Sequence, residues 1–397
     1  MTWSVKATER TTLRKNPNRV DKRGGEANFG TFDHRPPDNG DNYNWYEQTT
    51  NLQIDITSYC NARCGACIRN KNGDEVKDEL ILEHFDMEVW ERLAKEDTRG
   101  WFIGDLALNG NWGDPMMHPK LVEMLHIWTQ YHPETSLFLH TNGSMRTEKF
   151  WKDMGEVCRR FTNHLVVFAV DGMEDTHAIY RRYTDFNKIV ANIKAFTSTG
   201  GRANVMQTLF EHNKHQCKEI EQVAMECNAL YYTLRHSHGD DLLVEPKDSE
   251  SYRIHACYDI EPYQTRFDDL YEDWMPNRMS TNKDYNVYLD ASDRIKDARD
   301  EDQTVCPWFN DRQVQIDPWA KVWPCCHLSL YGTYIEANDL DKSVDQSFIE
   351  ARKQNDLKKN SLKEILLNDW FRNNLTDALN SGAWLKCRET CDVPCHD

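Results

Sequence analysis

Three cysteines stand within eight residues, in the segment Cys60-Asn-Ala-Arg-Cys64-Gly-Ala-Cys67. Thiolates ligate zinc and iron–sulfur clusters, and structural zinc sites generally take four protein ligands. Three thiolates on one loop would leave one iron of a [4Fe-4S] cubane without a protein ligand, and an open iron can bind a substrate. A structural zinc site and buried thiols without metal are the alternatives. The spacing favours the cluster.

Composition restricts the classes of protein that could carry such a site. The chain has 397 residues, 13 cysteines and a net charge of −17. Disulfide scaffolds are short and exported, whereas this chain is long and its polar N-terminus has no apolar signal core. The acidic balance argues against nucleic-acid binding, and no apolar stretch is long enough to span a bilayer. We therefore expect a cytoplasmic protein that binds metal and neither membrane nor nucleic acid.

Short apolar runs alternate with amphipathic stretches from Leu52 onward, which predicts a parallel α/β sheet with helical crossovers. The predicted strands are Leu52–Ile56, Phe102–Leu108, Ser136–His140, Leu165–Val170, Asn204–Leu209 and Leu230–Leu234. The predicted helices are Met87–Lys95, Pro119–Tyr131, Thr147–Phe161, Phe186–Thr199 and Lys214–Cys227. The cysteine loop follows the first strand, at the edge where α/β folds place their chemistry.

Outside the alternating pattern the sequence changes character. Residues 1–50 mix charge with Gly, Pro and Asn, which predicts an extended or disordered N-terminal arm. The alternating region covers 51–237, and 238–305 is a polar insertion or bridging region. Residues 306–397 predict a small C-terminal domain with a hairpin (Val314–Ile316, Lys321–Pro324) and a helix near Leu362–Leu379.

Small and polar residues recur at the ends of successive predicted strands, where turn formers and ligand contacts are both common. The candidates for ligand binding are Gly113, Asp114, Pro115, Asn142, Asp171, Gln207 and Asn213. Each alone is an ordinary turn or cap residue. Their order behind the cysteine loop favours a binding site, in which Gly113 would let the backbone approach a ligand closely.

The C-x3-C-x2-C segment and these strand ends together resemble the radical S-adenosylmethionine (SAM) superfamily. The resemblance implies a partial (β/α)6 TIM barrel, a [4Fe-4S] cluster on Cys60, Cys64 and Cys67, and SAM bound to its open iron. Two positions depart from the family pattern: Ala66 replaces a common aromatic residue, and Asp114 replaces Glu in a Gly-Gly-Glu-Pro motif whose backbone receives the SAM ammonium.

A second group of cysteines resembles the auxiliary-cluster extension called SPASM or, when shorter, twitch. It comprises Asp317-Pro-Trp-Ala-Lys-Val-Trp-Pro-Cys325-Cys326 together with Cys306, Cys387, Cys391 and Cys395. We expect one auxiliary [4Fe-4S] cluster on Cys306, Cys325, Cys387 and Cys391, with Cys395 as the substitute ligand. The alternatives are a structural zinc and a cluster with three protein ligands and an iron open to substrate. Ala320 stands where the family usually has Gly in the hairpin turn.

The resemblance implies reductive cleavage of SAM to a 5′-deoxyadenosyl radical, with a one-electron donor such as flavodoxin or ferredoxin. An auxiliary cluster would accept a second electron, which favours oxidation or cross-linking of a C–H bond in a peptide or protein. The alternatives are oxidation or rearrangement of a carbohydrate or nucleotide, and a metal-binding module without turnover. Asp311 and Asp317 are candidate bases only because they lie near the predicted auxiliary site.

Overall fold

The computed structural model describes residues 49–71, 73–96, 103–237, 241–247, 249–267, 313–335 and 353–375, together with Tyr46, Ala351 and Asp377. Most of the predicted N-terminal arm lies outside these residues. Four of the cysteines predicted to hold an auxiliary cluster are also outside them: Cys306, Cys387, Cys391 and Cys395.

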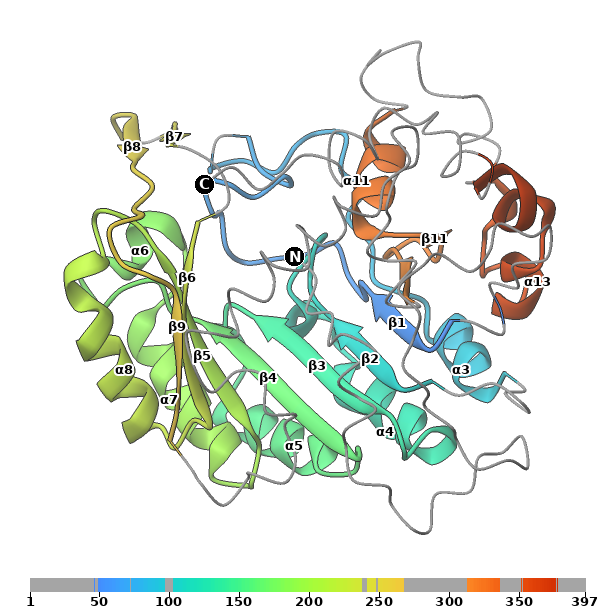
Figure 1. Ribbon diagram of the computed structural model, residues 1–397, viewed down its shortest axis with the longest axis horizontal. Helices are drawn as coiled ribbons and strands as arrows, with labels where there is room; N and C mark the ends of the chain where they lie inside the picture. The colour runs from blue at the N-terminus through green and yellow to red at the C-terminus, as the bar shows by residue number, and fades with distance from the viewer. Residues whose placement is uncertain are drawn as a thin grey trace, which may run out of the picture. The chain divides into compact units, whose positions relative to one another are not determined.

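The fold is α/β, and its strands form a nine-stranded sheet in the order β11-β10-β1-β2-β3-β4-β5-β6-β9 (Figure 1). The six predicted strands are all present and neighbour one another in chain order, and the pairs from β3 to β6 are parallel. This is the arrangement of the predicted partial (β/α)6 barrel. The strands are β1 Asn51–Ile54, β2 Asp105–Leu108, β3 Ser136–Thr141, β4 Asn163–Ala169, β5 Ala203–Leu209 and β6 Tyr231–His236.

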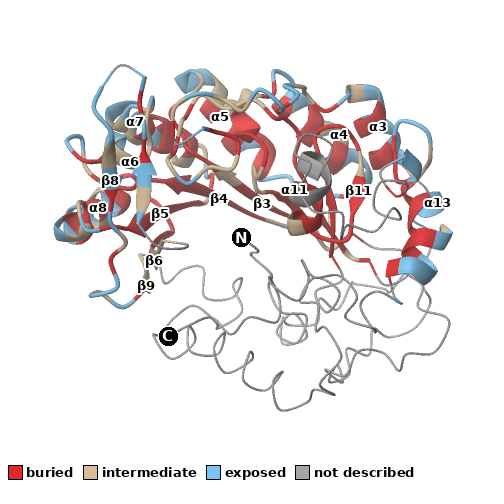
Figure 2. Cartoon of the chain, turned by 90° about the horizontal axis from the view of Figure 1, so that it is seen from above, coloured by how far each residue is buried: buried red, intermediate tan, exposed pale blue. Residues whose placement is uncertain are grey.

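The chain divides into two units, which we describe separately. One comprises residues 55–85 and 107–285. Its helices lie on one face of β3 to β6 (Figure 2), and nearly every residue of β4 and β5 is buried, as expected for strands covered on both faces. The helices are α4 Leu121–Tyr131, α5 Glu148–Cys158, α6 His177–Tyr180, α7 Phe186–Thr197 and α8 Cys217–Glu226, with short 3-10 turns η1 Pro115–Met117 and η2 Lys214–Gln216.

Local capping explains where these helices begin. The Thr147 hydroxyl accepts a hydrogen bond from the Phe150 N–H and begins α5, and the Asp185 carboxylate accepts one from Lys188 N–H and begins α7. The predicted helix Lys214–Cys227 is split, because its first turn is the 3-10 turn η2 and α8 begins only at Cys217.

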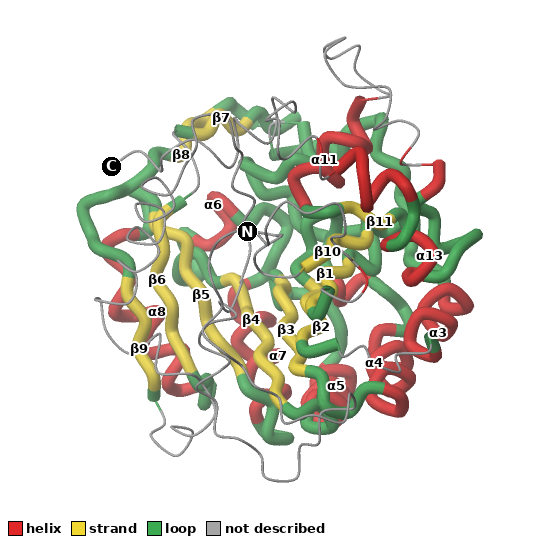
Figure 3. The backbone as a smooth tube through the Cα atoms, turned by 45° about the vertical axis from the view of Figure 1, so that its right-hand side comes forward, coloured by secondary structure: helices red, strands yellow, loops and turns green. Residues whose placement is uncertain are grey.

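Three further strands lie within the predicted insertion. Strand β9 (Tyr263–Arg266) pairs antiparallel with β6 and extends the sheet beyond the parallel strands (Figure 3). Strands β7 (Leu242–Val244) and β8 (Tyr252–Ile254) form a separate two-stranded sheet. Part of the insertion therefore has regular structure that its polar composition did not predict.

The other unit comprises residues 1–54, 86–106 and 286–397. Helix α3 (Met87–Lys95) has the predicted bounds, because the Asp86 carboxylate caps its first turn and Arg92 and Lys95 lie in its last. Strand β10 (Gln313–Ile316) pairs parallel with β1, and β11 (Val322–Trp323) pairs antiparallel with β10. The predicted C-terminal hairpin thus adds to the strand that precedes the cysteine loop.

The turn of this hairpin is built around Asp317. Its buried carboxylate accepts hydrogen bonds from the Trp319 N–H at 3.0 Å, the Lys321 N–H at 2.9 Å and the Trp323 ring N–H at 2.8 Å. Ala320 adopts φ of 65°, the left-handed conformation that glycine would supply in the family pattern. Asp317 therefore stabilises the turn, and the expectation that it is a candidate base has no support from its contacts.

The predicted helix near Leu362–Leu379 is interrupted. Helix α13 (Leu362–Leu366) starts with a capping box between Ser361 and Glu364, and a separate π-helical turn, η4 (Trp370–Asn374), follows. Between them the Asn368 side chain accepts a hydrogen bond from the Phe371 N–H, a local interaction that competes with a continuous helix. Helix α11 spans Cys326–Ile335.

Among the helices that the structure describes, none is long and apolar enough to cross a membrane.

Asp317→Asn should lower the free energy of unfolding by about 2 kcal/mol. Three N–H groups donate to the carboxylate, and the NH2 group of asparagine would face one of them without being able to accept its hydrogen bond. Chemical denaturation of the metal-free protein measures the change. Glu91→Gln is the control, since it removes a surface ion pair with Lys95 that should be worth less than about 1 kcal/mol. Equal effects of both substitutions would contradict the role given to Asp317.

Candidate metal and cofactor site

The three cysteines lie on the loop that follows β1. Cys64 is buried, and Cys60 and Cys67 are half-buried. Two turns shape the loop: the Cys67 N–H donates to the Cys64 carbonyl at 3.1 Å, and the Asn70 N–H donates to the Cys67 carbonyl at 2.9 Å. The loop is thus folded by its own backbone, with its thiols on adjacent turns.

The turn after β2 packs directly on the start of this loop. A Cβ atom placed on Gly113 would lie 2.5 Å from the Tyr59 carbonyl oxygen and in contact with the Thr57 carbonyl. The Asp114 N–H donates to the Tyr59 carbonyl at 2.9 Å. Glycine is therefore required here for close approach of the turn to the cysteine loop, whereas the sequence suggested close approach to a ligand.

The Asp114 side chain connects this turn to the end of β3. Its buried carboxylate accepts hydrogen bonds from the Met116 N–H at 2.9 Å, the Thr141 hydroxyl at 3.0 Å and the Asn142 N–H at 2.7 Å. Burial raises the pKa of Asp114, and the hydrogen bonds from Asn142 and Met116 oppose that shift. Pro115 follows as the first residue of η1.

Asn142 joins the end of β3 to the cysteines. Its side-chain amide donates to the side-chain oxygen of Asn61 at 2.9 Å and lies 3.7 Å from the Cys60 sulfur. Asn61 in turn donates to the Ser144 hydroxyl at 2.8 Å. Asp114, Asn142 and Cys60 therefore form one hydrogen-bonded chain.

A second series of hydrogen bonds connects the end of β4 to the cysteines. The Asp171 carboxylate is fully buried, accepts a hydrogen bond from the Arg181 Nε–H and also accepts one from the Thr208 N–H at 2.5 Å. A terminal nitrogen of Arg181 then lies 3.6 Å from the Cys64 sulfur. Asp171 thus positions Arg181 against a thiol.

The last two predicted residues do not reach the thiols. The Gln207 amide oxygen accepts a hydrogen bond from the Tyr232 hydroxyl at 2.6 Å, and its nitrogen donates to the Asn213 carbonyl at 3.4 Å. Asn213 donates to the Asp171 carbonyl at 3.0 Å and to the Thr208 carbonyl at 2.9 Å. Both residues are fully buried and hold the end of β5 against the end of β4.

The donor set fits an iron–sulfur cluster with three protein ligands. Burial raises the pKa of Cys60 to about 12, with a further contribution from Asp114, and burial also raises the pKa of Cys64. Both thiols are therefore protonated at neutral pH, and a metal centre would have to displace those protons. The N–H donors of Asn142 and Arg181 beside the sulfurs are the kind of groups that stabilise sulfur charge.

Two cysteines of the predicted auxiliary site lie within the described residues. Cys325 and Cys326 are buried at the end of the β10–β11 hairpin, and the Leu328 N–H donates to the Cys325 sulfur at 3.4 Å. Because the other predicted ligands lie outside the described residues, the auxiliary cluster stays a prediction.

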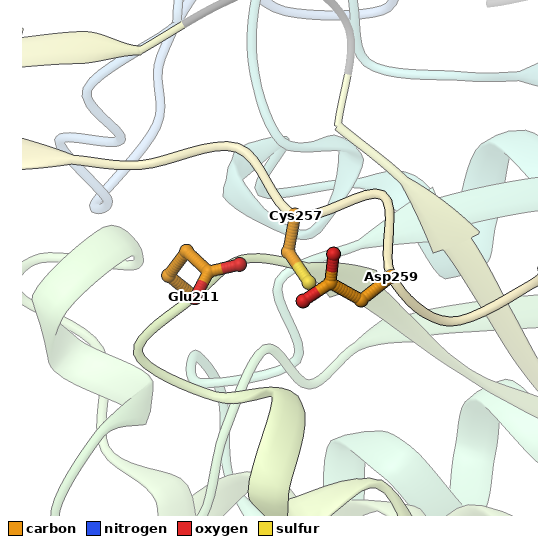
Figure 4. A group of neighbouring side chains, drawn as sticks. All are labelled: Glu211, Cys257 and Asp259. Carbon is orange, nitrogen blue, oxygen red and sulfur yellow. The ribbon is translucent and has the colours of Figure 1, made fainter.

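Glu211, Cys257 and Asp259 gather in a separate group whose ligand atoms lie within 4.8 Å of one another (Figure 4). The Lys214 ammonium pairs with Glu211 at 2.8 Å and with Asp259 at 2.7 Å. A cation from the protein already balances these exposed carboxylates, so the group does not argue for a metal ion.

Three residues near the thiols were not among the predicted site residues: Asn61, Arg69 and Arg181. Asn61 and Arg69 lie within or beside the cysteine motif, and Arg181 follows Asp171 by ten residues. No spacing rule marks them, because their contacts depend on how the strand ends meet.

Comparison with known proteins agrees with this geometry. The family described as Radical SAM superfamily matches residues 54–224. A curated relative, GTP 3′,8-cyclase of Nautilia profundicola, is 34% identical over 109 residues, which are 26% of this chain and 31% of the cyclase. The chain thus spans about a third of the length of the curated relative it matches.

Solved structures with a similar fold include SuiB of Streptococcus suis bound to S-adenosylmethionine, at 13% identity and a TM-score of 0.47, covering 85% of this chain and 72% of SuiB. The protein anSMEcpe with bound AdoMet has 16% identity and a TM-score of 0.45, covering 82% of this chain and 79% of its own. The family match, together with the three-cysteine loop at the end of β1, identifies residues 54–224 as a radical SAM domain.

Proposed function

We propose that this protein is an enzyme that reductively cleaves SAM and oxidises or cross-links a C–H bond in a peptide or protein. The observation that carries the proposal is the three-cysteine loop, whose sulfurs meet N–H donors from Asn142 at the end of β3 and from Arg181, which follows α6. A purely structural metal site has no need of an open coordination position, whereas three ligands on one loop provide one.

Cys60, Cys64 and Cys67 would hold the [4Fe-4S] cluster, which when bound supplies the electron that cleaves SAM into methionine and a 5′-deoxyadenosyl radical. The chain's own contribution is to fix this site and exclude water from it. Asp114 and Asn142 fix the loop at Cys60, and Asp171 holds Arg181 beside Cys64. The backbone of Gly113, Asp114 and Pro115 is the proposed contact for the SAM ammonium.

The choice of a peptide or protein as substrate rests on the C-terminal cysteines. An auxiliary [4Fe-4S] cluster on Cys306, Cys325, Cys387 and Cys391, or with Cys395, would accept an electron from a substrate radical and so support net oxidation. A one-electron donor such as flavodoxin or ferredoxin would reduce the enzyme. The burial of Cys325 at the end of a hairpin supports its place in such a centre.

A nucleotide or carbohydrate is the second candidate substrate. The observation that favours it is the 34% identity to a GTP 3′,8-cyclase, whose printed name describes a reaction on a nucleotide. The match covers 31% of that protein, so it bears on the shared segment and leaves the substrate of this chain to experiment.

Replacing Cys60, Cys64 and Cys67 together by Ala should abolish SAM cleavage and remove about half of the iron bound after anaerobic reconstitution, because one of two proposed cubanes loses its ligands. Iron and sulfide analysis and release of 5′-deoxyadenosine measure the two effects. Cys158→Ala is the matched control, since this buried thiol lies in α5 away from the loop. SAM cleavage by the triple variant would show the assignment of the site to be wrong.

Gly113→Ala should reduce iron uptake at the cysteine loop and destabilise the protein by about 3 kcal/mol, because the new methyl group would displace the backbone before Cys60. Gly65→Ala is the matched control in the same loop, since its methyl group would meet a Val244 side-chain methyl that can move more easily. Iron content and chemical denaturation report the result. Normal iron uptake by Gly113→Ala would mean that the close approach is not required.

The substrate class can be tested by isotope transfer. Reduced enzyme is incubated with SAM and either the peptide fraction or the small-metabolite fraction of a cell extract, prepared in deuterated and ordinary forms. We expect deuterium in 5′-deoxyadenosine from the peptide fraction, because the radical removes a substrate hydrogen. Transfer from the small-metabolite fraction alone would contradict the peptide proposal and support the nucleotide or carbohydrate alternative.

A further inference from the structure

Arg69 is a buried cation without a full set of partners. It follows Cys67 by two residues, and its side chain is 2% exposed. One terminal nitrogen donates to the Ser58 carbonyl at 2.6 Å. Its Nε and its other terminal nitrogen are buried and have no hydrogen-bond partner among the described residues.

Burying an arginine with unpaired N–H groups costs free energy unless an anion binds to it. Removing an arginine charge from water costs several kcal/mol, and a buried charge is normally paired. The Ser58 carbonyl satisfies one donor and carries no net charge, so most of this cost is uncompensated in the protein alone. The Lys77 N–H donates to the Arg69 carbonyl at 2.8 Å and fixes the backbone at this position.

The position of Arg69 indicates which anion its guanidinium would bind. The hydrogen bond to Ser58 ties the end of the cysteine loop to its start, two residues before Cys60. Ser58 precedes Cys60 by two residues and Arg69 follows Cys67 by two, so the guanidinium lies beside the loop that carries the thiols. A [4Fe-4S] cluster with three thiolates carries net negative charge, which increases on reduction.

We propose that Arg69 is the counterion of the cluster held by Cys60, Cys64 and Cys67, and that it stabilises the reduced cluster. Asn142 beside Cys60 is uncharged, and the charge of Arg181 is balanced by Asp171. Arg69 has no carboxylate partner among the described residues, and two of its guanidinium nitrogens have no hydrogen-bond partner there. The guanidinium of Arg63, in the same loop, differs because it donates to the carbonyls of Cys60 and Ala62. This inference rests on the proposed function, because it requires the cluster to be present.

The test is a redox titration of the reconstituted full-length protein, followed by electron paramagnetic resonance, with Arg69→Lys, Arg69→Gln and Arg69→Met. At a fixed potential the ratio of reduced to oxidised cluster should fall about tenfold in the Gln and Met variants, which is 59 mV for a one-electron couple. Arg69→Lys should stay near the wild type, because it keeps the charge. Iron content establishes that each variant carries its cluster.

Arg146→Gln is the matched control. Its guanidinium is bonded to the Met116 carbonyl at 2.6 Å and the His118 carbonyl at 2.8 Å, so its loss should lower stability without changing the midpoint potential. An unchanged midpoint in fully loaded Arg69→Gln and Arg69→Met would overturn the proposal. A change confined to SAM affinity would also overturn it, because the SAM carboxylate would then be the anion that Arg69 meets.

A second measurement covers variants that fail to take up iron. In the metal-free protein, removal of an uncompensated charge by Arg69→Met should leave the free energy of unfolding unchanged or higher, whereas loss of a purely structural residue should lower it. Lower stability in both the Lys and the Met variants would contradict the counterion role. Absence of a cluster from the wild type would instead refute the proposed function, so the two failures are distinguishable.

Discussion

The buried carboxylate of Asp114 connects three strand ends, and the candidate site depends on it. Its own N–H donates to the Tyr59 carbonyl after β1, and its side chain accepts from Thr141 and Asn142 at the end of β3. A carboxylate buried to this degree is stable only when its oxygens accept several hydrogen bonds. Asn142 carries the connection on to Cys60. Loss of this carboxylate would therefore remove the bonds to Thr141 and Asn142, and with them the fixed position of Asn142 beside Cys60.

Electrostatics around the thiols divides into two parts. The charges of Asp171 and Arg181 balance each other, and their hydrogen bond fixes a donor beside Cys64. At Cys60 the buried Asp114 opposes ionisation, while Arg69 favours it. Without a metal centre Cys60 and Cys64 stay protonated, because burial raises the pKa of both thiols, and the Arg69 charge stays uncompensated. A bound anionic cluster would replace the thiol protons and pair with the arginine charge. No group of the described residues does either.

The sequence predicted those features that depend on local pattern. Helix α3 was placed at its observed bounds because Asp86 and the apolar spacing that follows act within the helix itself. The strands β1 to β6 were also recognised, since each is an apolar run between amphipathic stretches. The break between α13 and η4 was missed because it depends on a single asparagine side chain.

Contacts between the ends of different strands could not be predicted from the sequence. The predicted ligand contact of Gly113 stays a prediction, and its close approach to the carbonyls of Thr57 and Tyr59 could not be derived from the sequence. Gln207 and Asn213 lie at or beyond the end of β5, and their side chains bond to Tyr232 of β6, to Thr208 of β5 and to Asp171 after β4. Asp317 reads as an exposed acid in sequence, but it is the buried centre of a turn.

The central claim is that the cysteine loop holds a cluster with an iron open to SAM. Electron paramagnetic resonance of the reduced full-length protein, recorded with and without SAM, tests it directly. The account predicts that SAM changes the part of the spectrum that disappears when Cys60, Cys64 and Cys67 are replaced, because the ligand binds the iron that lacks a thiolate. A spectrum of that cluster unaltered by saturating SAM would contradict the claim.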